Sequence, residues 1–130
     1  MGIGPRMELR GSARETIEVQ ARQQCLGWSM ITCVVHYTID PTELNAFEEF
    51  AREWIRLVTK HGGTHHGYFL PAEGASDQAE ALFSFESLAA YETYRERFGV
   101  DPEFIEADLI RDRSGCVLRY DRTFMRPLLQ

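Results

Sequence analysis

The sequence predicts one α+β domain with a single antiparallel sheet. The chain has 130 residues, of which 44% are apolar, and this size and composition suit one domain with a packed core. Segments rich in β-branched and aromatic residues alternate with segments of helical periodicity in the order β-α-β-β-α-β. Helix-capping residues and glycine-containing turns separate these segments. This order is the split βαβ, or ferredoxin-like, arrangement.

The first strand and the first helix have the sharpest signals. The segment MITCVVHYTI predicts a strand over Ile31–Ile39 because it is rich in β-branched and aromatic residues. Asp40 follows as a helix N-cap, Pro41 takes the first helical position, and Glu43 completes an Asp version of the capping box. The glycine pair at 62–63 ends this helix. Its apolar stripe consists of Leu44, Phe47, Ala51, Trp54, Ile55 and Val58.

The second half of the chain repeats the pattern with two more strands before its helices. GTHHGYFLP and AEALFSFES predict strands on either side of a turn-rich loop. Ser87 caps a helix through LAAYETYRERF, and Asp101 with Pro102 begins another in DPEFIEADLIRD that closes at Ser114 and Gly115. CVLRYDRTFM predicts the last strand. Residues 1–29 form an extension with weak periodicity that we expect to be poorly ordered, and a short helix from Ala13 to Gln24 stays open.

Composition excludes several classes of partner and site. The formal net charge is −6, and seventeen acidic against ten basic residues follow residue 29, so the domain repels nucleic acid and anionic membranes. No apolar run approaches the ~20 residues of a membrane span, and no apolar segment follows the first arginines, which predicts a soluble cytoplasmic protein. Cys25, Cys33 and Cys116 lack metal-binding spacing, so we expect reduced cysteines and no structural zinc.

The alternation within the strands divides the sheet into two unlike faces. Apolar residues on one side of the first and third strands predict the helix-covered side: Ile31, Cys33, Val35, Tyr37, Ala81, Phe83 and Phe85. The opposite side is mixed: Thr32, Val34, His36, Thr38, Leu82, Ser84 and Glu86. A mixed face of this kind suits the wall of a polar cavity or a sheet-to-sheet dimer interface.

Three segments of the chain together resemble the NIPSNAP family. They are HHGYF, LAAYETYRERFGVDPE and RYDRTFMRP, and the resemblance extends over residues 30–130. It implies a ferredoxin-like protomer whose open sheet packs against a second copy, which encloses a dimeric α+β barrel. Similar barrels include cofactor-independent monooxygenases, isomerases, haem enzymes and binding proteins, so the fold does not select one function.

Three of the four histidines lie close together in HGGTHHGYFLP. Neighbouring side chains of a strand point to opposite faces, so His65 and His66 cannot both bind one metal within a protomer, and we expect no metal. One of the two faces the cavity. His61 lies at the end of the first helix, where the helix dipole favours an imidazolium, and it is expected to be a C-terminal cap.

A better candidate site combines residues of several strands. His36, His66, Glu86 and Asp121 are candidate catalytic residues, because a histidine beside a carboxylate is what general acid–base chemistry requires. The same groups also suit an ion-paired dimer interface. Arg119 and Arg122 could hold an anionic group of a ligand, whereas Arg95 and Arg122 also suit a clamp between helix and sheet. The candidate ligand-binding residues are His65, Tyr68, Arg95, Arg119 and Arg122.

These observations predict a homodimeric barrel that binds a small organic molecule and needs no cofactor. The alternative is a cofactor-independent monooxygenase or isomerase that uses a cavity histidine as general base. Haem binding through one histidine and a purely structural interaction module remain open as further alternatives. No GxGxxG, P-loop or GxSxG motif occurs, so NAD, ATP and serine hydrolysis are not predicted.

Overall fold

The structure is a computed structural model, and it describes residues 30–128. The expectations for residues 1–29 therefore lie outside the described residues. Within 30–128 the chain forms four strands, three α-helices and one 3-10 helix. In chain order these are β1 (Ile31–Ile39), η1 (Pro41–Glu43), α3 (Leu44–Lys60), β2 (Thr64–Phe69), β3 (Gln78–Phe85), α4 (Leu88–Arg95), α5 (Pro102–Ser114) and β4 (Val117–Met125).

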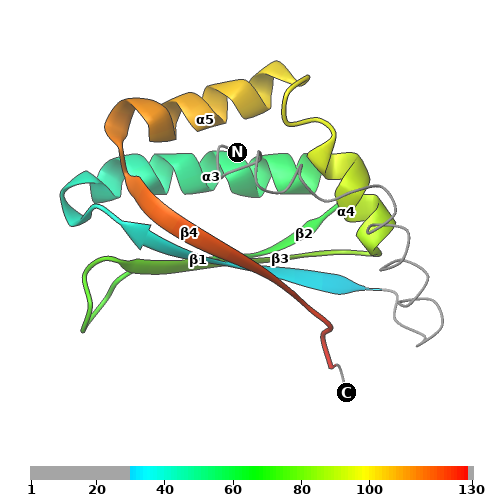
Figure 1. Cartoon of the computed structure of the whole chain (residues 1–130), viewed down its shortest axis with the longest axis horizontal. Helices are drawn as coiled ribbons and strands as arrows, with labels where there is room; N and C mark the ends of the chain where they lie inside the picture. Colours follow the sequence, from blue (N-terminus) through cyan, green and yellow to red (C-terminus); the bar gives the residue numbers. More distant parts are fainter. Residues whose placement is uncertain (1–29, 129–130) are drawn as a thin grey trace.

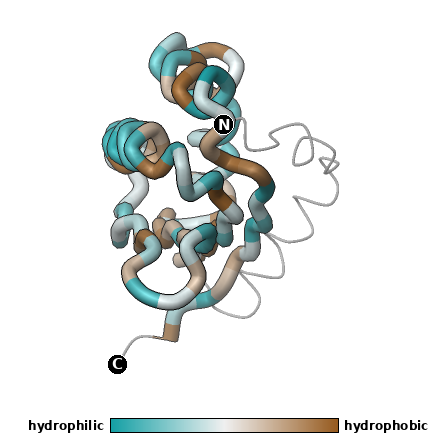
Figure 2. The backbone as a smooth tube through the Cα atoms, turned by 90° about the vertical axis from the view of Figure 1, so that its left-hand side faces the viewer, coloured by the Kyte–Doolittle hydropathy of each residue, from teal (hydrophilic) through white to brown (hydrophobic). Residues whose placement is uncertain are grey.

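The strands form one antiparallel sheet in the order β2-β3-β1-β4. This order, with the β-α-β-β-α-β sequence of elements, confirms the ferredoxin-like α+β fold. Helices α3, α4 and α5 all lie on the same side of the sheet (Figure 1), and the view turned by 90° shows the same two layers (Figure 2). Within residues 30–128, no helix covers the other side of the sheet.

The hydrophobic core lies between the helices and the sheet. Alternate residues of β1 are buried from Ile31 to Ile39, and the residues between them are partly exposed. Phe47 and Trp54, both predicted as core residues, are 0% and 2% exposed. Burial of a large apolar side chain stabilises a fold by about 1.5–3 kcal/mol, so this layer of aromatic residues fixes which face of the sheet meets the helices. The predicted assignment of the two sheet faces is therefore confirmed for β1 and β3.

The helix ends follow the predicted capping residues, with two differences. Asp40 accepts a hydrogen bond from the backbone N–H of Thr42, but the turn that follows is a 3-10 helix and α3 begins only at Leu44. Glu43 thus occupies the N-cap position of α3 itself, and the predicted capping box does not form. α4 ends at Arg95, short of the predicted Phe98, because the chain continues there in tighter turns with i→i−3 hydrogen bonds.

A β-bulge interrupts the pairing of β2 with β3. His65 lies opposite Phe83 and Gly67 lies opposite Leu82, so His66 is the extra residue. Gly67 adopts a φ of 108°, a region that L side chains rarely occupy. The bulge lets His65 and Tyr68, three residues apart, both point toward the helices, where their rings stack at 5.1 Å between centroids.

Candidate functional site

The side of the sheet away from the helices is the candidate functional surface, and we call it the open face. Strand register and hydrogen bonding place polar and apolar side chains side by side on it. From β2 and β3 it includes Thr64, His66, Phe69, Gln78, Glu80, Leu82 and Ser84. From β1 and β4 it includes Thr32, Val34, His36, Thr38, Arg119, Asp121, Thr123 and Met125. Ser84 is buried, at 4% exposure, although its side chain is polar, and no other polar or charged residue within 30–128 is classed as buried.

His36 is the centre of one polar cluster on the open face. Its Nδ1 lies 3.3 Å from Glu80 Oε2, and its Nε2 lies 2.5 Å from Gln78 Oε1. Asp121 is the partner of His36 in the register with β4, as Glu80 is in the register with β3, so acidic residues lie opposite His36 on both neighbouring strands. Arg119 holds Asp121 through a contact of 3.2 Å. The cluster thus combines an imidazole with carboxylates, which is the composition that proton transfer requires.

The amide of Gln78 is oriented by a second contact. Its Nε2 donates to Asp77 Oδ1 at 3.0 Å, which leaves Oε1 facing His36. Both ring nitrogens of His36 therefore face acceptor oxygens, and both hydrogen bonds form together only when both nitrogens carry protons. In this arrangement His36 is suited to donate a proton or a hydrogen bond. It can accept a proton only after one of these contacts is released.

A second polar cluster, which contains no carboxylate, lies toward the other end of β1 and β3. Ser84 Oγ is 2.7 Å from Thr32 Oγ1 and 2.8 Å from His66 Nε2. Val34 and Leu82, which lie opposite each other in the register, separate this cluster from His36. The open face therefore carries two polar clusters with an apolar strip between them.

His65 lies on the helix side of the sheet, away from both clusters. Its ring stacks between Tyr68 and Phe83, at centroid distances of 5.1 and 5.5 Å. Nδ1 accepts a hydrogen bond from the backbone N–H of Gly67. Burial, together with the neighbouring His66, lowers the pKa of His65 to about 4. His65 is therefore neutral at physiological pH and packs as an aromatic residue.

Tyr68 and two of the predicted arginines also lie on the helix side. Tyr68 contacts the core rings, and burial raises the pKa of its hydroxyl. Arg122 Nη1 donates to the Tyr91 hydroxyl at 2.7 Å, which ties β4 to α4. Arg95 lies 3.7 Å from Glu92 on the same helix, and its side chain is 11% exposed. The contact between Arg122 and Tyr91 suits a clamp between sheet and helix.

Glu86 differs from the other predicted catalytic residues because it follows the last residue of β3 and is exposed. The structure brings His36, His66, Asp121 and Arg119 to the open face and leaves His65, Tyr68, Arg95 and Arg122 on the other side. The role of each predicted residue in catalysis or ligand binding stays a prediction.

The sequence interpretation did not single out Gln78, Glu80, Thr32 or Ser84 as site residues. A usable signal existed in the alternation of β3, because residues 78, 80, 82 and 84 share one side of a strand. The predicted strand began at residue 79, which concealed Gln78. The hydrogen bond between Ser84 and His66 forms at the β-bulge, and the sequence pattern did not predict this bulge.

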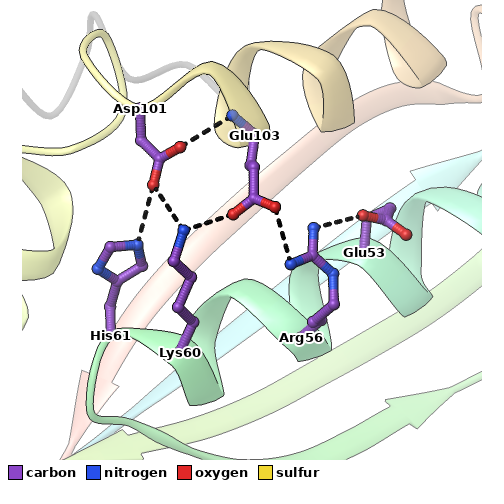
Figure 3. A network of polar contacts seen from close by, with 6 residues as sticks. All are labelled: Glu53, Arg56, Lys60, His61, Asp101 and Glu103. Atoms are coloured by element: carbon purple, nitrogen blue, oxygen red, sulfur yellow. Dashed lines mark hydrogen bonds and ion pairs between the residues drawn. The ribbon is translucent and has the colours of Figure 1, made fainter.

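A separate cluster of charged residues joins the end of α3 to the start of α5 (Figure 3). Lys60 Nζ contacts Asp101 at 3.2 Å and Glu103 at 2.5 Å. His61 Nε2 lies 3.3 Å from Asp101, and its ring stacks on Phe104. Asp101 also caps α5 by accepting from the backbone N–H of Glu103. These contacts form between neighbouring helix ends, so the cluster is structural.

Two kinds of site are not found in the described part of the chain. Residues 30–128 contain no group of three or more His, Cys, Asp or Glu placed to hold a metal ion. In the same range, each helix is either too short or too polar to cross a membrane.

Comparisons with known proteins place the chain among proteins of the same architecture. A NIPSNAP family protein of unknown function from Agrobacterium tumefaciens has 20% identity and a TM-score of 0.65, over 76% of this chain and 88% of that chain. An uncharacterized NIPSNAP-like domain protein from Burkholderia xenovorans has 22% identity and a TM-score of 0.63, over 77% and 86%.

A third solved structure with this fold is a putative antibiotic biosynthesis monooxygenase from Caulobacter crescentus. It has 13% identity and a TM-score of 0.62, and the match covers 84% of this chain and 99% of that chain. No curated protein matches the sequence. The family model of NIPSNAP matches residues 33–129, which is most of the chain and includes all three segments on which the resemblance was based. The chain therefore belongs to the NIPSNAP family.

Proposed function

We propose that this NIPSNAP protein forms a homodimer through its open face and binds a small organic molecule between the two sheets. The observation that carries the proposal is the mixed composition of the open face, which no helix covers within residues 30–128. Apolar side chains lie exposed on the same surface, including Phe69 at 57% and Met125 at 55% exposure. A second copy would remove this apolar surface from water and supply the missing layer.

The polar residues of the open face are compatible with burial in such an interface. Burial of a polar group is costly unless the group keeps a hydrogen-bond partner. Within one protomer, Ser84 already bonds to Thr32 and His66, and Arg119 already contacts Asp121. A second sheet could therefore cover these groups without breaking their contacts.

The division of the face into clusters supports a binding role over a purely structural one. A dry interface needs apolar contact, whereas two polar clusters around an apolar strip give a small molecule both a surface to lie on and groups that orient it. His36 with Glu80 offers proton donors and carboxylate acceptors at one end. Val34 and Leu82 offer apolar contact in the middle.

The test compares two glutamate substitutions of exposed or partly exposed apolar residues. We expect Val34→Glu to convert the dimer to monomer, because two copies of a new charge would meet in the middle of the interface. Ile105→Glu, on α5 and 47% exposed, is the matched control and should leave the dimer intact. Mass photometry or light scattering would report the oligomer, and circular dichroism would check the fold. Dimers in both variants would contradict the use of the open face.

A second candidate function is cofactor-independent monooxygenase or isomerase chemistry with a histidine of the open face as general base. The contact of 3.3 Å between His36 and Glu80 favours it, since a carboxylate orients an imidazole for proton transfer, and release of the contact with Gln78 would free Nε2 to accept a proton. The fold likeness to a putative antibiotic biosynthesis monooxygenase agrees with this candidate and does not establish it.

The second candidate is tested by turnover of activated phenols and β-dicarbonyl compounds, followed as oxygen uptake or as a change in absorbance. His36→Ala and His66→Ala are each assayed after their dimers are shown to be intact. We expect the variant that lacks the base to lose turnover by about 10²–10⁴-fold. Turnover that survives in both variants would overturn the acid–base candidate and leave the binding proposal in place.

A further inference from the structure

The cluster of Thr32, Ser84 and His66 has a specific recognition chemistry. We propose that these three residues form a subsite that binds an uncharged ligand group able both to donate and to accept a hydrogen bond, such as a carboxamide or a hydroxyl. This inference rests on the proposed function, since it places the subsite on the same open face. It adds a second point of recognition, distinct from His36, and names the ligand chemistry that this point selects.

The hydrogen-bond chain itself presents one donor and one acceptor. The three groups are joined by two contacts, of 2.7 Å and 2.8 Å, that both pass through Ser84 Oγ. If Thr32 donates to Ser84 and Ser84 donates to His66 Nε2, then His66 Nδ1–H points outward as a donor and Thr32 Oγ1 remains an acceptor. If the chain runs the other way, these roles exchange. The free edge of His66 is therefore a donor in one direction and an acceptor in the other, so a ligand group that can both donate and accept fits it in either case.

The burial pattern shows which part of the cluster meets a ligand. Ser84 is only 4% exposed, whereas His66 is exposed. Nε2 of His66 is held by Ser84, and among residues 30–128 Nδ1 has no hydrogen-bond partner. Ser84 thus acts as the positioning residue that fixes the imidazole, and the outer edge of His66 contacts the ligand.

The β-bulge strengthens this assignment because it fixes the backbone that carries His66. The extra residue in β2 is His66 itself, and Gly67 with its positive φ follows it. Bulges re-aim a side chain relative to a regular strand, and this one presents His66 beside Ser84.

Charge selects against ionic ligand groups. The hydrogen bonds of the cluster involve no carboxylate and no arginine or lysine among the described residues. An anionic or ammonium group bound at the cluster would lose hydration without meeting a carboxylate, arginine or lysine of the cluster, whereas an uncharged group would keep its hydrogen bonds. The neighbouring Val34 and Leu82 add an apolar surface, so a carboxamide on an aromatic ring fits best.

The experiment titrates three probes of similar shape and different charge into the full chain: benzamide, benzoate and benzylamine. Two-dimensional NMR follows the imidazole signals of His66 and the amide signals of residues 82–84. We expect benzamide to produce saturable shifts at His66, and benzoate and benzylamine to bind at least fivefold more weakly. Ser84→Ala, which removes both hydrogen bonds, should weaken benzamide about fivefold. His66→Ala provides a second variant if Ser84→Ala fails to fold.

Thr59→Val is the matched control because it removes an exposed hydroxyl from α3, on the helix side of the sheet, and it should leave benzamide binding unchanged. Equal binding of benzoate and benzamide, no saturable shift at His66, or the same benzamide affinity in Ser84→Ala would each overturn the subsite. The mass of the same samples separates the two proposals. Ser84-dependent binding of benzamide by a monomer supports the subsite and contradicts the dimer. A dimer that does not bind benzamide supports the dimer and contradicts the subsite.

Discussion

The adjacent histidines of β2 illustrate how one position decides the chemistry of a side chain. His65 faces the core and stacks between two rings, and its pKa is lowered to about 4. His66 faces away from the helices and bonds to a serine hydroxyl. The same residue type thus serves as core packing at one position and as a surface polar group at the next. Only the second can contact a ligand on the open face.

The lowered pKa of His65 gives a prediction about acid stability. The pKa is about 4 in the fold and near its ordinary value of 6.5 in the unfolded chain. Protonation therefore favours unfolding, so stability is lost as the pH falls from 6.5 toward 4. We expect His65→Phe, which keeps an aromatic ring between Tyr68 and Phe83, to show a smaller loss. Urea unfolding at pH values of about 7 and about 5 would measure it. An equal loss in both proteins would contradict the assignment.

At the scale of elements, β2 depends on a bulge that only certain residues allow. The bulge turns His65 and Tyr68 toward the helices and leaves Gly67 at a φ of 108°. A side chain at this φ is strained even where space is available. Gly67 is therefore required by the backbone and not by packing.

We expect Gly67→Ala to lower the free energy of unfolding by about 1–3 kcal/mol, the usual cost of a residue held in a sparsely populated backbone conformation. Gly99→Ala is the control, since a Cβ at Gly99 meets nothing within 4 Å and no positive φ is required. Chemical denaturation of both variants measures the difference. Similar stabilities for the two variants would mean that the bulge relaxes around an alanine.

The charged cluster holds the end of α3 against the start of α5. The backbone N–H of Glu103 and then Lys60 and His61 lower the pKa of the Asp101 carboxyl, so it is ionised at neutral pH. Asp101 makes two contributions to stability that substitutions can separate. One is the cap of α5, and the other is the attraction to the end of α3 (Figure 3).

Asp101→Asn keeps a capping oxygen and removes the charge, whereas Asp101→Ala removes both. We expect Asp101→Ala to lower Tm by several degrees and Asp101→Asn to lower it less, because exposed ion pairs contribute little. Thermal unfolding at neutral pH in low and high salt would measure both effects. If Asp101→Asn proves as destabilising as Asp101→Ala, the ion pairs, and not the cap, hold the junction.

At the scale of the whole molecule, the sequence predicted the fold well because its signals are local. β1 was predicted with its observed bounds, and Ser87 and Asp101 cap the helices as predicted. The two faces of the sheet followed from a period of two. The site was harder to predict because it depends on register between strands. Glu80 meets His36, and Ser84 meets Thr32, only through pairing across 44 and 52 residues of chain. No local pattern encodes such pairs.

The open face is the feature on which the account of the whole molecule depends. This side of the sheet carries hydrogen-bonded polar clusters together with exposed apolar residues. The proposed burial of that surface by a second copy would explain both properties together, because it would cover the apolar residues and enclose the polar clusters around a ligand.

Native mass spectrometry of the full chain, purified gently and without added ligand, tests this claim most directly. One spectrum reports the oligomer and any molecule that it retains. The account predicts a species with the mass of two 15.0 kDa chains, together with a form of higher mass that carries a small organic molecule. A bare species at 15.0 kDa across micromolar concentrations would contradict it.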